Sequence, residues 1–93
     1  MTNYELLFVL KPDFSETELG DVVAEVEEAV KKSRGEVAKR DEWGKRELAY
    51  EIDRFNKGYY FVWQVELPKN DVAFLKRNLK LNENILRVLF TKI

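Results

Sequence analysis

The chain has 93 residues, contains neither cysteine nor histidine, and carries a net charge of −1. This length suits one domain with a small core, so residues 1–93 are expected to form a single unit. Without cysteine there is no disulfide or thiolate metal site, and without histidine the commonest general base and metal ligand are missing. The composition therefore argues against an enzyme, and we expect neither a cofactor nor a metal ion.

Charge is distributed unevenly along the chain. Residues 1–34 carry four basic and eight acidic side chains, whereas residues 35–93 carry twelve basic and nine acidic ones. A polyanion can bind the basic part of such a molecule although the whole chain is nearly neutral. The alternative interpretation is an ordinary surface of mixed charge. No apolar run approaches membrane-spanning length and the N-terminus lacks a secretion signal, so we expect a cytoplasmic protein.

The first two elements are a strand and a helix. From Asn3 to Leu10, apolar residues occur at both odd and even positions, so both faces of a strand here would be largely apolar. This pattern predicts a central strand. Ser15 and Glu18 have the spacing of a capping box, which predicts the start of a helix. Apolar residues then recur every three or four positions as far as Val30, and Gly35 is the expected end of the helix.

A hairpin is predicted next. Glu36 to Ile52 reads as one long strand, in which Gly44 is expected to mark a bulge. A third strand is expected from about Gly58 to Leu67. The face expected to pack in the core carries the alternating residues Tyr59, Phe61, Trp63, Val65 and Leu67. Because residues 53–58 separate these two runs, we expect a hairpin with a longer loop.

The last two elements are a helix and a strand. Asn70 is expected to cap a helix whose buried stripe contains Leu75 and Leu79. A turn at 82–84 leads to a strand over 85–93, which turns Val88 and Phe90 inward and Arg87, Leu89 and Thr91 outward.

This order, β-α-β-β-α-β, predicts an α+β fold of the ferredoxin-like class. Right-handed crossovers place both helices on one face of a four-stranded antiparallel sheet, with the first and third strands central. The opposite face stays open and carries more apolar side chains than a solvated surface needs. We interpret it as a partner-binding surface, formed by Leu7, Val9, Tyr60, Val62 and Leu89.

Cations and aromatic residues occur together in the second part of the chain. Lys45 and Arg46 follow Trp43 on the long hairpin, Lys80 ends the second helix, and the last strand carries Arg87 and Lys92. Phosphates pair with lysine and arginine, and bases stack on aromatic rings, so this combination favours RNA. The alternative for each cation is a solvated side chain that lies along apolar surface.

Small phosphatases of the acylphosphatase type share the predicted architecture. Their phosphate-cradling loop after the first strand is rich in glycine and contains an arginine. Here that position reads Leu10-Lys11-Pro12-Asp13-Phe14, with neither residue. No P-loop, nucleophile-elbow motif or carboxylate cluster suited to a metal appears either, which argues against phosphatase chemistry.

The chain resembles the family of the sixth protein of the bacterial small ribosomal subunit. The resemblance covers essentially the whole chain. It rests on Tyr4-Glu5, the motif Trp43-Gly44-Lys45-Arg46-x-Leu48-Ala49-Tyr50-x-Ile52, Gly58-Tyr59-Tyr60 and Asn84-Ile85-Leu86-Arg87-Val88. Two positions depart from the usual pattern. Glu51 replaces proline, which frees a backbone N–H, and Glu47 stands beside the basic pair, where it opposes phosphate attraction.

This resemblance implies a non-catalytic, RNA-binding ribosomal protein. It implies binding to the central domain of small-subunit ribosomal RNA, together with the eighteenth small-subunit protein as a heterodimer. Lys45, Arg46 and Arg87 are the RNA-contact residues that it implies, and the charge pattern adds Lys80 and Lys92. The alternative is a regulatory or scaffolding module of the same fold that self-associates through its open sheet and does not bind RNA.

Overall fold

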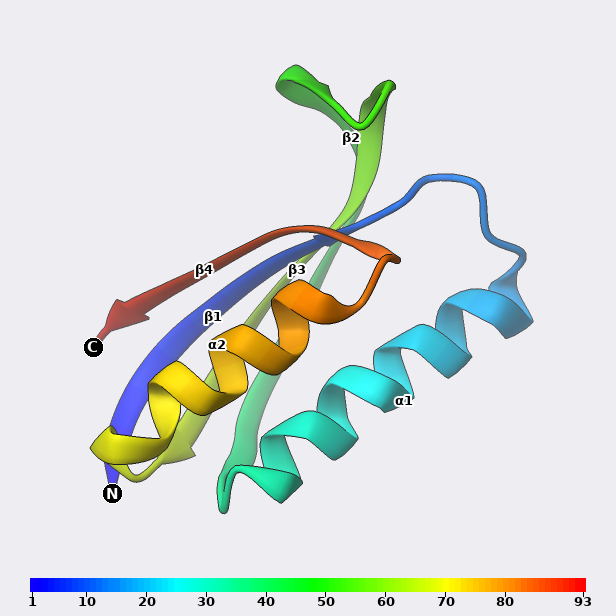
Figure 1. The fold of residues 1–93 in the computed structure, drawn as a ribbon. Helices are drawn as coiled ribbons and strands as arrows, with labels where there is room; N and C mark the ends of the chain where they lie inside the picture. Colours follow the sequence, from blue (N-terminus) through cyan, green and yellow to red (C-terminus); the bar gives the residue numbers. More distant parts are fainter.

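The order of elements matches the predicted β-α-β-β-α-β sequence. In the computed structural model, which describes all residues 1–93, four strands form one antiparallel sheet in the order β2-β3-β1-β4. The helices α1 and α2 cover one face, and the end of the β2–β3 hairpin projects beyond both (Figure 1). The bounds are β1 Thr2–Leu10, α1 Glu16–Lys32, β2 Glu36–Ile52, β3 Phe55–Leu67, a 3-10 turn Lys69–Asp71, α2 Val72–Leu81 and β4 Ile85–Lys92.

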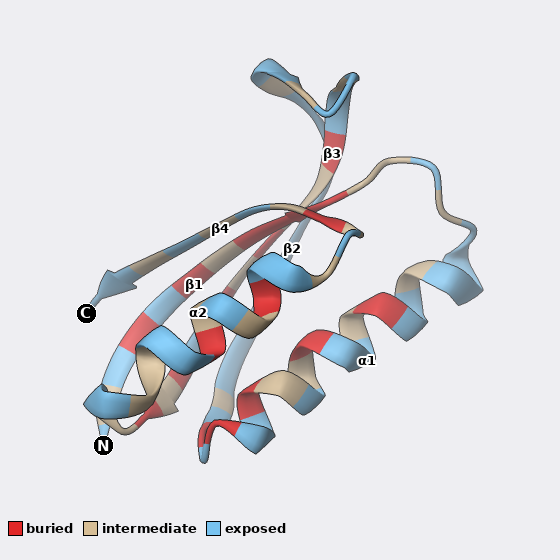
Figure 2. Cartoon of the chain, viewed as in Figure 1, coloured by how far each residue is buried: buried red, intermediate tan, exposed pale blue.

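The core lies between the helices and the sheet. Burial is concentrated on β1, on the adjoining part of β3 and on the helix sides that face the sheet, while the hairpin end is mostly exposed (Figure 2). Phe8 stacks on Phe61 with ring centroids 5.0 Å apart, and it is perpendicular to the ring of Trp63 with centroids 4.9 Å apart. These three rings come from the two central strands, as the alternation of apolar residues predicted.

The capping box at the start of α1 is confirmed. The Ser15 hydroxyl accepts from the Glu18 backbone N–H at 3.2 Å, and the Glu18 carboxylate accepts from the Ser15 N–H at 3.0 Å. The backbone N–H of Ser15, and to a smaller extent its side chain, lower the pKa of Glu18 because they favour the charged carboxylate. The helix ends at Lys32, close to the predicted stop, but the residue with positive φ is Arg34, at 63°.

Gly35 is therefore required for a reason that differs from the predicted one. A Cβ at Gly35 would lie 2.8 Å from the Glu66 carbonyl oxygen and 2.9 Å from Leu67 Cβ. The chain leaves α1 so close to β3 that no side chain fits between them. The glycine permits close packing, while Arg34 adopts the left-handed conformation.

Two predicted local features are wrong. The loop of the hairpin contains only Asp53 and Arg54, and β3 begins at Phe55 rather than near Gly58. Both turn residues have positive φ, 49° and 71°, as in the tight turns that match the twist of antiparallel strands. The Asp-Arg pair lacks the glycine that usually marks such a turn, so the sequence did not predict a two-residue turn here.

The other wrong prediction is the cap of α2. Asn70 lies in the 3-10 turn, and Asp71 occupies the cap position without a side-chain hydrogen bond to the helix. The Asp71 carboxylate instead accepts from the Arg34 guanidinium, at 2.7 Å from Nη2 and 3.1 Å from Nε. This long-range ion pair joins the end of α1 to the start of α2.

A matched pair of glycine substitutions tests the packing of the sheet. A Cβ at Gly58 would lie 2.5 Å from Val9 Cγ1 and 2.9 Å from the Leu10 carbonyl oxygen, whereas one at Gly20 meets nothing within 4 Å. We expect Gly58→Ala to lower the free energy of unfolding by about 1–3 kcal/mol through overpacking. Gly20→Ala should raise it by roughly 0.5–1 kcal/mol, because alanine is the better helix former. Urea unfolding of both variants checks this, and equal effects would contradict it.

An ion pair also links α1 to β2. Arg40 Nη2 lies 2.8 Å from Glu27 Oε1, and this hydrogen bond lowers the pKa of Glu27 and raises the pKa of Arg40. A carboxylate with a lowered folded-state pKa stabilises the fold above its unfolded pKa, and this contribution disappears as pH falls through the folded pKa.

Below about pH 4.5, the ordinary value for a glutamate, the chain should therefore lose stability as Glu27 protonates. The variant Glu27→Gln should be less stable than the parent chain at neutral pH and lose less stability on acidification. Urea midpoints at neutral and acidic pH measure this difference. Glu28→Gln serves as the control, since Glu28 makes no ion pair and no side-chain hydrogen bond. If Glu27→Gln lost as much stability on acidification as the parent chain, protonation of Glu27 would not be the cause of the loss.

Candidate nucleic-acid interface

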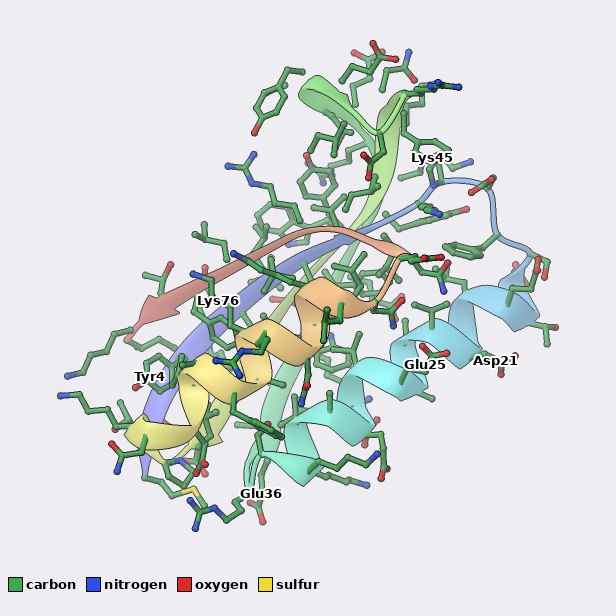
Figure 3. The ribbon with its side chains drawn as sticks, viewed as in Figure 1. Tyr4, Asp21, Glu25, Glu36, Lys45 and Lys76 are labelled. Atoms are coloured by element: carbon green, nitrogen blue, oxygen red, sulfur yellow. The ribbon has the colours of Figure 1, made fainter.

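The β2–β3 hairpin carries the predicted basic pair beyond the end of the helical layer. Figure 3 shows Lys45 on this projecting part, away from Asp21 and Glu25 on α1. A bulge lies just before it, because Glu42 pairs with Phe61 and Gly44 with Tyr60, which leaves Trp43 as the extra residue. Gly44 has φ 78°, so the predicted bulge is confirmed.

Lys45 and Arg46 point to opposite faces of the hairpin. Lys45 pairs with Tyr59, whose ring packs against the core, and its Nζ lies 5.3 Å from the centre of that ring. Arg46 pairs with Gly58 on the other face, and its guanidinium carbon lies 5.3 Å from the centre of the Trp43 ring. The adjacent cations therefore present charge on two sides of one arm.

The tip of the hairpin returns toward the last strand. The Tyr50 hydroxyl accepts from Arg87 Nη1 at 3.1 Å, and the Arg87 guanidinium carbon lies 5.7 Å from the centre of the Tyr50 ring. Since β2 and β4 are the two edge strands, this contact spans the sheet. A large irregularity permits it, because the pairing jumps from Glu47–Lys57 to Ile52–Phe55.

Arg87 and Lys80 come together at this end of the molecule. Both line a hollow of about 420 Å³. Its other walls are Asp53 from the hairpin turn and, at the start of β4, Ile85, Leu86 and Val88. Two predicted RNA contacts that are distant from the hairpin in sequence thus lie beside its tip.

Lys92 lies apart from these cations. It is exposed near the C-terminal end of β4, where it pairs with Tyr4, whereas Arg87 pairs with Val9. In Figure 1 the end of β4 lies at the left of the view and the hairpin end at the top. The five cations therefore do not form one continuous patch: four lie toward the hairpin end on different faces, and Lys92 lies apart.

The open face of the sheet contains the predicted apolar row. Leu7 pairs with Val62 on one side and with Leu89 on the other, and Leu89 is 48% exposed. Tyr60 and Val9 form the next row, but Val9 is fully buried instead of available to a partner. The cause is the hairpin. The backbone of Gly58 lies against Val9, and Leu48 lies against that same glycine.

Two exposed aromatic side chains extend the candidate interface. Trp43 is 46% exposed and Tyr50 is also exposed, and each has an arginine over its ring. In the sequence, Trp43 is noted only as a neighbour of the basic pair, and no function is predicted for Tyr50. The signal in the sequence is their place in a run rich in charged residues, and the structure shows that β2 contains no buried residue.

Other kinds of site have little support in the structure. No three acidic side chains gather closely enough to hold a metal ion. Neither helix is long and apolar enough to span a membrane. The hollow between α1 and α2 is lined mainly by exposed polar residues, with Asp21, Glu25, Glu28, Lys32 and Asn78 around two alanines.

Comparison with known proteins identifies the family. Residues 3–92 match the family model described as "Ribosomal protein S6". The chain is 42% identical to the small ribosomal subunit protein bS6 of Campylobacter hominis over 99% of its own length and 63% of that protein. It is 34% identical to the bS6 protein of Halalkalibacterium halodurans over 99% of its length and 97% of that protein.

Structural comparison agrees with the sequence matches. The crystal structure of the 30S ribosomal protein S6 from Thermotoga maritima superimposes with a TM-score of 0.90 at 26% identity. The match covers 99% of this chain and 87% of that one. The predicted ferredoxin-like fold and the resemblance inferred from the hairpin motif are both confirmed. The chain therefore belongs to the ribosomal protein S6 family.

Proposed function

We propose that this chain is a structural constituent of the small ribosomal subunit that binds ribosomal RNA through the hairpin end. The family match over residues 3–92 carries this proposal, because the relatives are named as small-subunit proteins. The geometry supplies a location for RNA, since Lys45, Arg46, Lys80 and Arg87 all lie near the hairpin end. Family membership also agrees with the prediction of a non-enzymatic protein.

The RNA that we propose is the central domain of small-subunit ribosomal RNA. Cations on two faces of a projecting arm suit contacts to phosphates, which position a protein on RNA without reading much sequence. The exposed aromatic rings add surfaces on which unpaired bases stack. We place the protein in the cytoplasm, on the ribosome.

The protein partner that we propose is the eighteenth small-subunit protein. Leu7, Val62 and Leu89 offer it a continuous apolar row on the face without helices, bordered by Tyr60. Leu89 is exposed and the other members of the row are partly exposed, and an apolar row that solvent can reach is typical of a contact surface. Val9 does not belong to this surface while the hairpin covers it.

One experiment tests both parts of the proposal. A fragment that contains the central domain is titrated with the protein at several salt concentrations, with and without the eighteenth protein. Saturable binding that weakens with salt and tightens with the partner supports the proposal, because phosphate contacts release counterions. Binding no stronger than to an unrelated RNA in both conditions would refute it.

Self-association through the open face is the second candidate. The observation that favours it is the exposure of Leu89 on the face without helices. It predicts a molecular mass that rises with protein concentration and returns to the monomer value in Leu89→Asp. A mass that stays monomeric over the whole concentration range would exclude this candidate.

A further inference from the structure

We propose that Trp43 and Arg46 form a preformed site for one unpaired nucleotide of RNA, whose base stacks on the indole and whose phosphate binds the guanidinium. This assignment rests on the RNA-binding function proposed above and specifies one site within it. It is distinct from general attraction of phosphates, because it requires a free base.

The geometry of the pair is the first argument. Arg46 Nε donates to the Trp43 carbonyl oxygen at 3.1 Å, and the guanidinium lies over the indole at 5.3 Å from the ring centre. One hydrogen bond to the Trp43 backbone and one cation–π contact with its ring thus hold the guanidinium beside the indole. A base that binds meets an ordered platform, which reduces the entropy lost on binding.

The free surfaces of the pair are the second argument. The terminal amino groups of Arg46 make no hydrogen bond or ion pair within the chain, so their donors are available to a phosphate. Trp43 remains 46% exposed although Arg46 covers part of the ring. An exposed π surface beside unpaired donors matches the base and the phosphate of one nucleotide.

The position of the pair is the third argument. Trp43 is the extra residue of the bulge in β2, an edge strand, and bulges redirect side chains away from the regular pleat. Its neighbour Glu42 lines the hollow between α1 and the sheet, but Trp43 does not, and the indole stays exposed. A single strand of RNA can therefore reach the indole, whereas a stacked base inside a duplex cannot.

Intrinsic fluorescence tests the site because the chain contains two tryptophans in opposite environments. Trp63 is 1% exposed, so a base of a bound RNA cannot stack on it, whereas Trp43 is nearly half exposed. We expect a short single-stranded RNA to quench the emission of Trp43. An RNA duplex of the same length and the polyanion heparin should quench it much less, because both supply charge without a free base.

Substitutions make the test quantitative. Trp43→Leu should abolish the quenching and weaken binding of the single-stranded RNA about tenfold, as expected for the loss of one stacked base. Trp43→Phe should retain most of the affinity, since a ring remains. Phe74→Leu is the control, because Phe74 is a similarly exposed aromatic residue on α2, away from the hairpin. Circular dichroism verifies that every variant folds.

The outcomes separate this proposal from the broader one. If Trp43→Leu binds the single-stranded RNA within twofold of the parent chain, the nucleotide site is refuted even though RNA binding stands. Equal quenching by heparin and single-stranded RNA refutes it as well. If the parent chain binds the central-domain fragment no better than unrelated RNA, with or without the partner, both proposals fail.

Discussion

Phe8→Ala is expected to lower the free energy of unfolding by about 3–5 kcal/mol, the range for loss of a buried phenyl ring. Phe8 is fully buried on the central strand β1, where it contacts the parallel ring of Phe61 and the perpendicular ring of Trp63. Its removal leaves a cavity whose rigid walls come from the sheet and cannot collapse easily. The change in the urea midpoint, at an unchanged slope, measures this loss.

Leu89→Ala is the matched control for that experiment. Leu89 lies on β4 beside β1 but projects from the open face and is half exposed. Its truncation should change the free energy of unfolding by less than about 0.5 kcal/mol. A loss from Phe8→Ala as small as that from Leu89→Ala would mean that the ring cluster does not hold the fold together.

The largest effect on binding is expected from Arg46→Ala combined with Arg87→Ala. Each guanidinium offers charge-assisted hydrogen bonds to phosphate, so each loss should weaken binding to the central-domain fragment roughly tenfold. The dependence of the logarithm of affinity on the logarithm of salt should become shallower by about one unit per residue. Filter binding at several salt concentrations measures both quantities.

Lys92→Ala is the control for each of the two single substitutions, because it also removes one positive charge. Lys92 is an exposed cation at the other end of β4, away from the hairpin. If RNA lies at the hairpin end, this variant should bind like the parent chain. An equal loss from Lys92→Ala would instead indicate that RNA follows the whole edge of β4. No loss from the double variant would remove the hairpin end from the interface.

The features that the sequence predicted correctly depend on short-range patterns. The capping box needs only Ser15 and Glu18, and the bulge needs one glycine inside a long strand. The order of elements then leaves few possible topologies, because crossovers are right-handed. The overall fold was therefore predictable from periodicity and caps.

The features that the sequence did not predict depend on contacts between distant segments. Asn70 does not cap α2, because a 3-10 turn over Lys69–Asp71 precedes the helix, and the Asp71 carboxylate binds Arg34 from the end of α1. Val9 is buried because Gly58 lets the hairpin approach it closely. The division of the cations into two groups follows from the lengths of the strands and from the return of the hairpin tip toward Arg87. No local pattern contains this information.

The projecting part of the hairpin also divides the molecule into regions of different local stability. Amide hydrogens of β1 are enclosed between β3 and β4, so their exchange with solvent should require unfolding of the whole domain. Residues 45–57 pair mainly with one another beyond the helical layer, so their amides should exchange through local opening. Substitutions in this arm can therefore alter what the protein recognises while its melting temperature stays almost constant.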